Sequence, residues 1–223
     1  MPHASRHQCF LYDGSPSQPL PRLATAIRQH LDERYRCLYL HSPAMVAEMR
    51  SLLCTGGTDV VQLVTQGCLV LSSGCDHLLD GKFHIDRMVT MLKNAVNKAL
   101  ADGYRGLFAT GDMSWEFGPE NDFSKLVEYE WQLEELFKEQ PALSGICQYH
   151  VDTLPAKVLR EGLLTHPALY FNATLSRLNP YYVKRQSFAA HPVNIPALDA
   201  AIRDLCKMPE ALLLRALPPG YLL

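Results

Sequence analysis

Short apolar runs alternate with longer segments of helical periodicity along this chain, and this alternation constrains the fold more than any other feature. The apolar runs predict strands over residues 7–12, 36–40, 59–64, 68–71, 106–110, 144–149 and 168–171. The helical periodicity predicts helices over residues 20–31, 43–56, 85–100, 123–139 and 155–164. Because strands that alternate with helices of this length are joined by right-handed crossovers, we expect an α/β fold with a mostly parallel sheet between layers of helices.

The pattern loosens after residue 172, and two short helices are predicted beyond a loop, over residues 196–206 and 209–217. Leu198, Ile202 and Leu205 lie on one side of the first of these helices. We therefore expect residues 7–182 to form one domain. Residues 183–223 are expected to form a linker and a short helical tail that packs on the core or on a partner.

The composition excludes several classes of protein. With 21 basic and 23 acidic residues and no basic stripe, the chain is not expected to bind nucleic acid directly. Its apolar runs are interrupted well before the roughly 18 residues that a membrane span needs. Seven cysteines without framework spacing, and no secretory pattern at the N-terminus, favour a cytoplasmic location in which most cysteines are buried apolar groups.

The segment after the first predicted strand excludes an ordinary phosphate-binding loop. Such a loop reads GxxxxGK followed by Ser or Thr, and its N–H groups cradle the phosphates. Counted from Gly14, Pro19 stands in place of the second glycine. Leu20 replaces the lysine and Pro21 replaces the hydroxyl residue, and each proline removes an N–H group. The segment is therefore either a plain connection or a ligand loop remodelled for something other than a nucleotide.

Ligands of open α/β sheets bind at the carboxyl ends of the strands, and suitable side chains lie there. Tyr12 and Asp13 end the first predicted strand, and Asp112 and Trp115 follow the strand at 106–110. Asp112 could orient a polar ligand or hold a metal, or it could only accept N–H groups in a turn. Trp115 suits the wall of a small-molecule pocket, and core packing is the alternative.

Glu130 is the anomalous residue of the helix predicted over 123–139. It lies three residues after Val127 and three before Leu133, inside the apolar stripe of that helix. A carboxylate that faces the sheet needs a hydrogen-bond partner or a wet cavity, because an unpartnered one is costly to bury. A paired structural carboxylate and a pocket-lining one are both open at this point.

Cys147 and His150 end another predicted strand, and His166 precedes the last one. A Cys and a His three residues apart can bind zinc, but this pair lacks the other ligands of a site. The same residues could form a nucleophile pair oriented by Asp112 or Glu130, or Cys147 could simply be buried. The sequence contains no GxSxG, no HExxH and no dinucleotide fingerprint. We therefore expect no catalytic residues, no metal and no cofactor.

Several segments, taken together and in this order, resemble one family over about residues 7–182. They are His7-x-Cys9-x-Leu11-Tyr12, Leu79-Asp80-Gly81-Lys82-Phe83, Gly103-Tyr104-x-Gly106-Leu107, Gly111-Asp112-Met113-Ser114-Trp115, Tyr129-Glu130, Cys147-Gln148-Tyr149, His166-Pro167 and Asn179-Pro180-Tyr181-Tyr182. The family is the MEDS domain, the sensory domain of DcmR-type regulators of methanogens and methylotrophs. The chain departs from it at His150, where the family usually has an acid. No DNA-binding module is recognised before residue 7, so regulation is expected to need a partner or the tail.

The resemblance implies a three-layer fold similar to the RecA-like P-loop ATPases, with a degenerate phosphate loop. It also implies a domain that senses small hydrocarbon-derived molecules for a bacterial or archaeal signalling or transcription-regulating system. We expect one non-catalytic site at the carboxyl edge of the sheet, with aromatic walls and polar contacts. Its predicted ligand-binding residues are Tyr12, Asp13, Asp112, Trp115, Tyr129, Glu130, Cys147, Tyr149 and His166.

Other functions stay open at the level of sequence. One is an enzyme with residual nucleotide hydrolysis or with chemistry at Cys147. Another is a ligand-free scaffold whose acidic helix or C-terminal tail docks a partner. A signalling or regulator protein is the expected macromolecular partner, and a homodimer is an open alternative.

Overall fold

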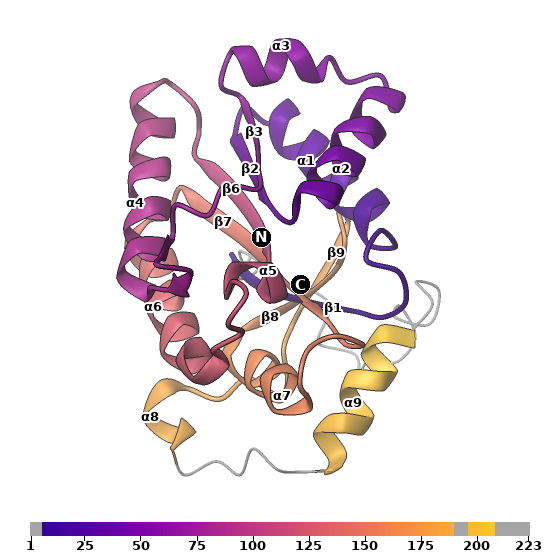
Figure 1. Ribbon diagram of the computed structural model, residues 1–223, viewed down its shortest axis with the longest axis vertical. Coiled ribbons are helices and arrows are strands. Elements are labelled where there is room, and N and C mark those ends of the chain that lie inside the picture. The colour runs from indigo at the N-terminus through magenta and orange to yellow at the C-terminus, as the bar shows by residue number, and fades with distance from the viewer. Residues whose placement is uncertain (1–5, 190–195, 208–223) are drawn as a thin grey trace.

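The computed structural model describes residues 6–189 and 196–207. A seven-stranded sheet of order β3-β2-β6-β7-β1-β8-β9 lies at its centre (Figure 1). Its strands are β1 His7–Tyr12, β2 Arg36–Leu40, β3 Leu69–Ser72, β6 Leu107–Asp112, β7 Leu143–His150, β8 Ala168–Asn172 and β9 Leu175–Leu178. All neighbouring pairs are parallel except β8 and β9. The predicted α/β fold with a mostly parallel sheet is confirmed, and nothing in it conflicts with the RecA-like arrangement.

Helices cover both faces of the sheet and make three layers. One face carries α1 Leu20–Asp32, α2 Pro43–Thr55 and α3 Val60–Thr65; the other carries α4 Ile85–Ala101, α6 Leu126–Glu139, α7 Ala156–Thr165 and α9 Pro196–Lys207. Two short helices, α5 Met113–Glu116 and α8 Arg185–Phe188, a 3-10 turn Phe123–Lys125 and a hairpin of β4 Leu78–Leu79 with β5 Lys82–Phe83 connect the larger elements.

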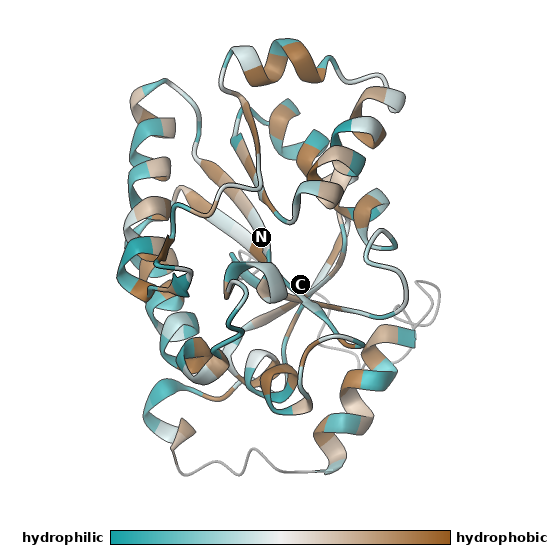
Figure 2. Cartoon of the chain, viewed as in Figure 1, coloured by the Kyte–Doolittle hydropathy of each residue, from teal (hydrophilic) through white to brown (hydrophobic). Residues whose placement is uncertain are grey.

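Alternation of side chains along the strands divides the interior into two apolar cores. On β1, Cys9 and Leu11 belong to the core under α4, α6 and α7, whereas Phe10 belongs to the core under α1 and α2. The helices meet these cores with one apolar side each; on α4 this side includes Met88 and Val96. Figure 2 shows the resulting mixture of hydrophilic and hydrophobic residues along these helices.

One predicted strand is wrong, and the prediction that the strand at 168–171 is the last one is wrong as well. Residues 59–64 carry three valines and read as a strand, but they form α3, because the Asp59 side chain accepts the N–H of Gln62 at 2.9 Å and caps the helix. The strand at residue 168 is not the last one either. The Asn172 side chain accepts the N–H of Thr174 at 2.9 Å, and this turn returns the chain as the antiparallel edge strand β9.

The first tail helix is present as α9, and the helix expected over 209–217 lies outside the described residues. Leu198 and Ile202 of α9 belong to the core on the α7 side of the sheet. Arg160 of α7 donates from Nε to Asp199 of α9 at 2.7 Å. This segment of the tail therefore packs on the core.

The cysteines are less buried than the sequence predicts. All seven are free, but only Cys9, Cys37 and Cys147 are buried, while Cys54 and Cys75 are exposed. The prediction that most of them are buried apolar groups is therefore wrong. Separately, each helix in the described segments is too short or too polar to cross a bilayer.

Gly106, which directly precedes β6, is expected not to tolerate a side chain. A Cβ at this position would overlap the backbone oxygen of Ala142, which accepts the N–H of Leu107 at 2.9 Å between β6 and β7. We therefore expect Gly106→Ala to lower the free energy of unfolding by about 3 kcal/mol in a urea titration. Gly74→Ala, at an exposed glycine, is the control and should stay within about 0.5 kcal/mol of the wild type. Equal stability of the two variants would contradict the close packing of β6 on β7.

Candidate functional site

A row of buried polar side chains crosses the sheet near its carboxyl edge, on the face covered by α1 and α2. We call it the polar row; its members are Tyr12, Tyr39, His41, Thr110, Asp112, Gln148 and His150. They come from the ends of four neighbouring strands, β1, β2, β6 and β7. The register pairs Tyr12 with His150, and it also pairs Asp112 with Gln148. These side chains therefore lie side by side on one face.

Asp112 is the principal acceptor of the polar row. Its Oδ2 accepts the Tyr12 hydroxyl at 3.1 Å. Its Oδ1 accepts the N–H of Trp115 at 3.0 Å and the hydroxyl of Ser114, and these bonds cap α5. Asp112 thus has the turn role that the sequence left open. Its second oxygen still faces the row.

Three buried atoms of the polar row have no hydrogen-bond partner among the described residues: Tyr39 Oη, His41 Nε2 and Gln148 Oε1. The N–H of Ser42 donates to His41 Nδ1 at 2.8 Å, so a neutral His41 carries its proton on Nε2. That nitrogen lies 3.8 Å from Asp112 Oδ2, which is too long for a hydrogen bond. Buried polar atoms are almost always hydrogen-bonded, so these three atoms are available to bond a ligand or an ordered water.

The loop over residues 13–19 leaves β1 beside the polar row. His150 Nε2 donates to the carbonyl oxygen of Gly14 at 2.9 Å, and the N–H of Gly14 donates to Asp152 at 2.8 Å. The N–H groups of Gln18 and Leu20 donate to carbonyl oxygens within the loop. These N–H groups of the loop are therefore already hydrogen-bonded to oxygen atoms of the protein, and one of those oxygens belongs to the carboxylate of Asp152.

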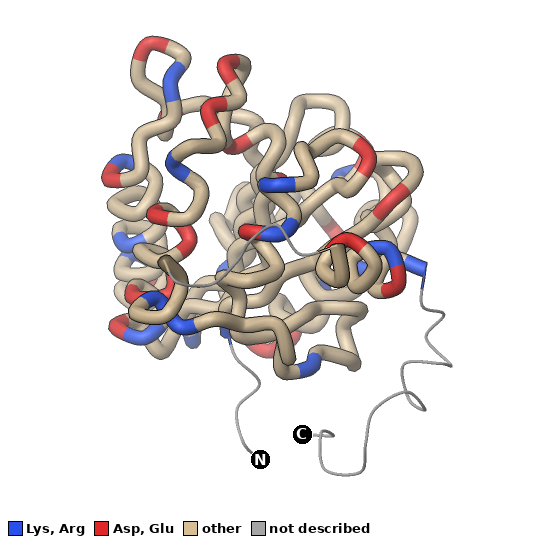
Figure 3. Tube along the Cα trace, turned by 90° about the horizontal axis from the view of Figure 1, so that it is seen from below, with Lys and Arg blue, Asp and Glu red and all other residues tan. Residues whose placement is uncertain are grey.

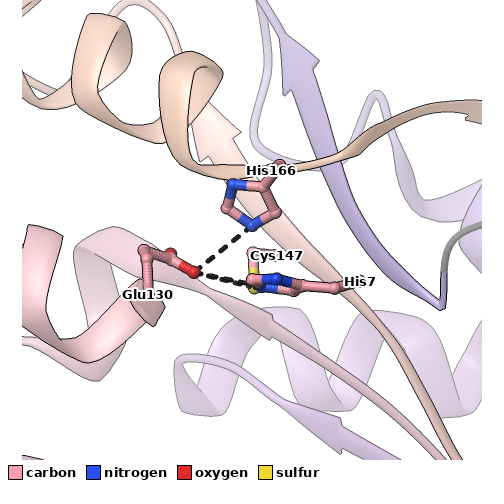
Figure 4. A group of neighbouring side chains, drawn as sticks. All are labelled: His7, Glu130, Cys147 and His166. Atoms are coloured by element: carbon pink, nitrogen blue, oxygen red, sulfur yellow. Dashed lines mark hydrogen bonds and ion pairs between the residues drawn. The ribbon is translucent and has the colours of Figure 1, made fainter. Parts of the chain in front are cut away.

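A second group of buried polar side chains lies in the layer between the sheet and helices α6 and α7 (Figure 4). We call His7, Glu130, Cys147 and His166 the buried cluster. Glu130 Oε2 lies 3.1 Å from His7 Nε2 and 3.3 Å from His166 Nε2, and Oε1 accepts the Tyr149 hydroxyl. Cys147 Sγ lies 3.7 Å from His7 Nε2. Glu130 therefore faces the sheet as a paired carboxylate.

Both histidines of the buried cluster are oriented through their other ring nitrogen. His7 Nδ1 lies 3.1 Å from Glu134 Oε2, and His166 Nδ1 lies 2.7 Å from the carbonyl oxygen of Gly162. Burial lowers the pKa of His166 to about 4, although Glu130 opposes this shift. Burial also acts to lower the pKa of His7, but hydrogen bonds to Glu130 and Glu134 raise it above its ordinary value.

Tyr129 belongs to neither the polar row nor the buried cluster. Its hydroxyl donates to Glu116 Oε2 at 2.9 Å, beside a cavity of about 30 Å³ lined mainly by apolar side chains. A cavity of this size holds about two water molecules, so it is too small for an organic ligand. The role of Tyr129 in ligand binding therefore stays a prediction, and this cavity beside it does not supply the space for one.

Glu116 gives a pH-dependent prediction. Burial raises its pKa well above the ordinary value of 4.5. A carboxyl group whose pKa is higher in the folded state favours folding less as the pH rises from 4.5 toward the folded pKa. Glu116→Gln removes this penalty and keeps an acceptor for Tyr129. We expect the variant to have the higher urea midpoint near pH 8 and its advantage to shrink toward pH 5; a constant difference across this range would contradict the shift.

The residues predicted to bind one ligand lie in three places. Tyr12, Asp13, Asp112 and Trp115 lie at the carboxyl edge; Glu130, Cys147, Tyr149 and His166 lie in or beside the buried cluster; and Tyr129 contacts Glu116. The expectation of a single edge site is wrong for His166, because this residue lies two positions before β8, at the amino end of that strand. Trp115 is half-buried, with its ring 5.1 Å from that of His77.

Sequence reasoning misses functional residues in both groups. His7 begins the first family motif, and alternation along β1 places it on the same face as Cys9 and Cys147, so the pattern held a usable signal. Tyr39 gave none, because it reads as an ordinary strand residue until the register sets it beside Thr110. Gln148 stands in a family motif, but only the register places it beside Asp112.

A three-layer α/β domain with polar side chains gathered at the carboxyl ends of its central strands has the architecture of small-molecule-binding domains. A family model matches residues 6–167, and its description is MEDS, the methanogen/methylotroph, DcmR sensory domain. Because this match covers more than half of the chain, the chain belongs to the MEDS family of sensory domains. The resemblance seen in the motifs is confirmed. No curated protein matches the chain.

Proposed function

We propose that this chain is a non-catalytic cytoplasmic sensory domain whose polar row binds one small, neutral, oxygenated hydrocarbon derivative. Its membership in a sensory family supports the sensing role. The observation that carries the proposal is the set of unbonded atoms Tyr39 Oη, His41 Nε2 and Gln148 Oε1. Several buried atoms in one row call for a partner that the described residues do not supply, and we assign that partner to a ligand.

The chemistry of the polar row indicates the class of ligand. His41 offers an N–H donor and Gln148 offers a carbonyl acceptor, so the ligand needs both an acceptor and a donor. A hydroxyl group supplies both. The carboxylates of Asp112 and Asp152 disfavour an anion beside them. An alcohol or a similar neutral compound therefore fits this row better than a carboxylate or a phosphate.

The loop over residues 13–19 supports a ligand other than a nucleotide. The N–H of Gly14 is bonded to the carboxylate of Asp152, and α1 begins after Pro19 without a side-chain cap. An anion bound there would displace a negative group from the same donor. This favours the remodelled loop over a residual nucleotide hydrolase.

Cys147 is poorly suited to nucleophilic catalysis. Burial and nearby carboxylates raise the pKa of its thiol well above the ordinary value of 9.0. A thiol that stays protonated is a weak nucleophile, and Cys147 is buried inside β7 instead of lying at its carboxyl end. These facts favour a sensor over a Cys-based enzyme.

Ligand binding in the polar row would reach the surface through two short segments. One is the loop over residues 13–19, held by His150 and Asp152; the other is α5, capped by Asp112. A signalling or transcription-regulator protein would read this change. Figure 3 shows basic and acidic residues interspersed along the described chain, which favours a protein partner over direct nucleic-acid binding.

The proposal is tested by thermal denaturation of the full chain with short alcohols, amides, halogenated hydrocarbons and the matching carboxylates. A compound at about 100 times its Kd should raise Tm by about 5–10 °C. Trp115 fluorescence in a Trp131→Phe background should change at the same concentrations, because the backbone N–H of Trp115 donates to Asp112 of the polar row.

His41→Phe should abolish the thermal shift, while His84→Phe, at a half-buried histidine outside the polar row, should preserve it. If no neutral compound raises Tm, the ligand-free scaffold becomes the better account. A shift that survives in His41→Phe would move the ligand to another part of the chain.

A further inference from the structure

The buried cluster has the donor atoms and the spacing of a transition-metal site. One ligand atom from each of its four members lies within 4.8 Å of all the others, and Figure 4 shows the side chains pointing toward one another. Glu130 Oε2 lies 3.1 Å from His7 Nε2, 3.3 Å from His166 Nε2 and 4.0 Å from Cys147 Sγ. A tetrahedral Zn²⁺ ion sets nitrogen, oxygen and sulfur ligands about 3.3–3.6 Å apart. These three separations are within about 0.4 Å of this range. The 4.8 Å limit for the whole cluster is wider, so the ligands would have to close around the ion.

When no cation is bound, two hydrogen-bond acceptors of the buried cluster face each other with no hydrogen atom between them. The carbonyl oxygen of Gly162 can only accept, so His166 Nδ1 donates to it, and Nε2 of the neutral ring carries a lone pair. That lone pair faces Glu130 Oε2 at 3.3 Å, and Nε2 has no hydrogen-bond partner among the described residues. His166 is fully buried. A metal ion between the two atoms would convert an unfavourable contact into two bonds.

The surrounding groups hold the cluster as the outer partners of metal ligands do. Glu134 lies against His7 Nδ1 and leaves Nε2 directed at the cluster. The Tyr149 hydroxyl occupies Glu130 Oε1 and leaves Oε2 available. One thiolate, one carboxylate and two neutral imidazoles balance the charge of a divalent ion, and the ion itself favours the thiolate.

The cluster is also close to the surface at the amino edge of the sheet. A groove of about 750 Å³ is lined there by residues that include His7 and Glu134. Because His7 belongs to the buried cluster and Glu134 contacts it, the groove reaches the edge of the cluster.

We propose that His7, Glu130, Cys147 and His166 bind one tetrahedral Zn²⁺ ion. All four ligands come from the protein, so the ion is structural: it joins β1, α6, β7 and the segment before β8 beneath the sheet. The expectation of no metal relied on short ligand motifs, whereas these ligands come from four separate segments. The site is distinct from the polar row and does not depend on its ligand.

The test begins with the untagged full chain in reducing buffer. The chain is stripped with a chelator, titrated with Co²⁺ and then with Zn²⁺, and its metal content is measured after gel filtration. We expect one zinc per chain to be retained. The cobalt form should show a thiolate-to-cobalt charge-transfer band and the intense visible bands of tetrahedral Co²⁺, and zinc should remove both.

Matched variants assign the ligands. Cys147→Ser should lose the charge-transfer band, whereas Cys9→Ser, its buried register partner on β1, should keep it. Glu134→Gln should weaken zinc binding by about 10–100-fold by releasing His7. Glu135→Gln, at the exposed neighbour on α6, should leave the affinity unchanged.

Circular dichroism identifies any variant that fails to fold, and the wild-type measurement decides the question without the variants. A wild-type chain that retains no zinc would overturn the proposal. A charge-transfer band that persists in folded Cys147→Ser would overturn it as well.

Discussion

Replacing Glu130 with alanine is expected to lower the free energy of unfolding by about 3–5 kcal/mol. Glu130 is fully buried and bonds His7 and the Tyr149 hydroxyl. Its removal leaves the buried Tyr149 hydroxyl without its acceptor and the buried His7 imidazole without one of its two carboxylates. A urea titration of chelator-treated protein measures the effect without any contribution from a bound metal.

Glu128→Ala is the matched control, two residues away on the same helix. Glu128 is exposed and accepts from Arg185 at 2.9 Å across the surface. An exposed ion pair contributes at most about 1 kcal/mol, so this variant should be nearly as stable as the wild type. If Glu130→Ala were equally mild, Glu130 would not be the central acceptor of the buried layer.

Replacing Asp112 with alanine is expected to cost about 3 kcal/mol, because it combines the loss of a helix cap with an unsatisfied buried group. The carboxylate caps α5 through Trp115 and accepts the buried Tyr12 hydroxyl. Asp112→Asn keeps the capping oxygen and should cost less than half as much. Equilibrium denaturation of both variants separates the two contributions.

Asp59→Ala isolates the capping contribution. Asp59 also caps a helix, by accepting the N–H of Gln62, but it is exposed and has no second partner comparable to Tyr12 among the described residues. Its loss should cost about 1 kcal/mol. If Asp112→Ala cost no more than this, the Tyr12 contact would contribute nothing, and Asp112 would be a turn residue only.

The layered fold is predictable from the sequence because strand and helix periodicities differ in most of the chain. The valine-rich segment 59–64 is the instructive failure: its composition favours a strand, yet one carboxylate that caps its first turn makes it helical. The edge strand β9 was missed because it has only four residues, Leu175-Ser176-Arg177-Leu178, which do not alternate between apolar and polar.

The candidate sites were predictable only in part. Glu130 was identifiable because a charged residue inside an apolar stripe must find partners. His166 was grouped with Glu130 but assigned to the carboxyl edge, and His7 was missed. Each lies at the amino end of a strand, while site prediction looks at the carboxyl ends. The unbonded atoms of Tyr39 and Gln148 depend on strand register, which local sequence does not specify.

The account depends most on a molecule binding in the polar row, and the most direct measurement is electron density there. Crystals of the full chain should be grown with the neutral compound that raises Tm most. We predict density for one hydroxyl-bearing molecule within hydrogen-bond distance of His41 Nε2 and Gln148 Oε1. Those two atoms bonded to protein side chains, with the compound elsewhere or absent, would contradict the account.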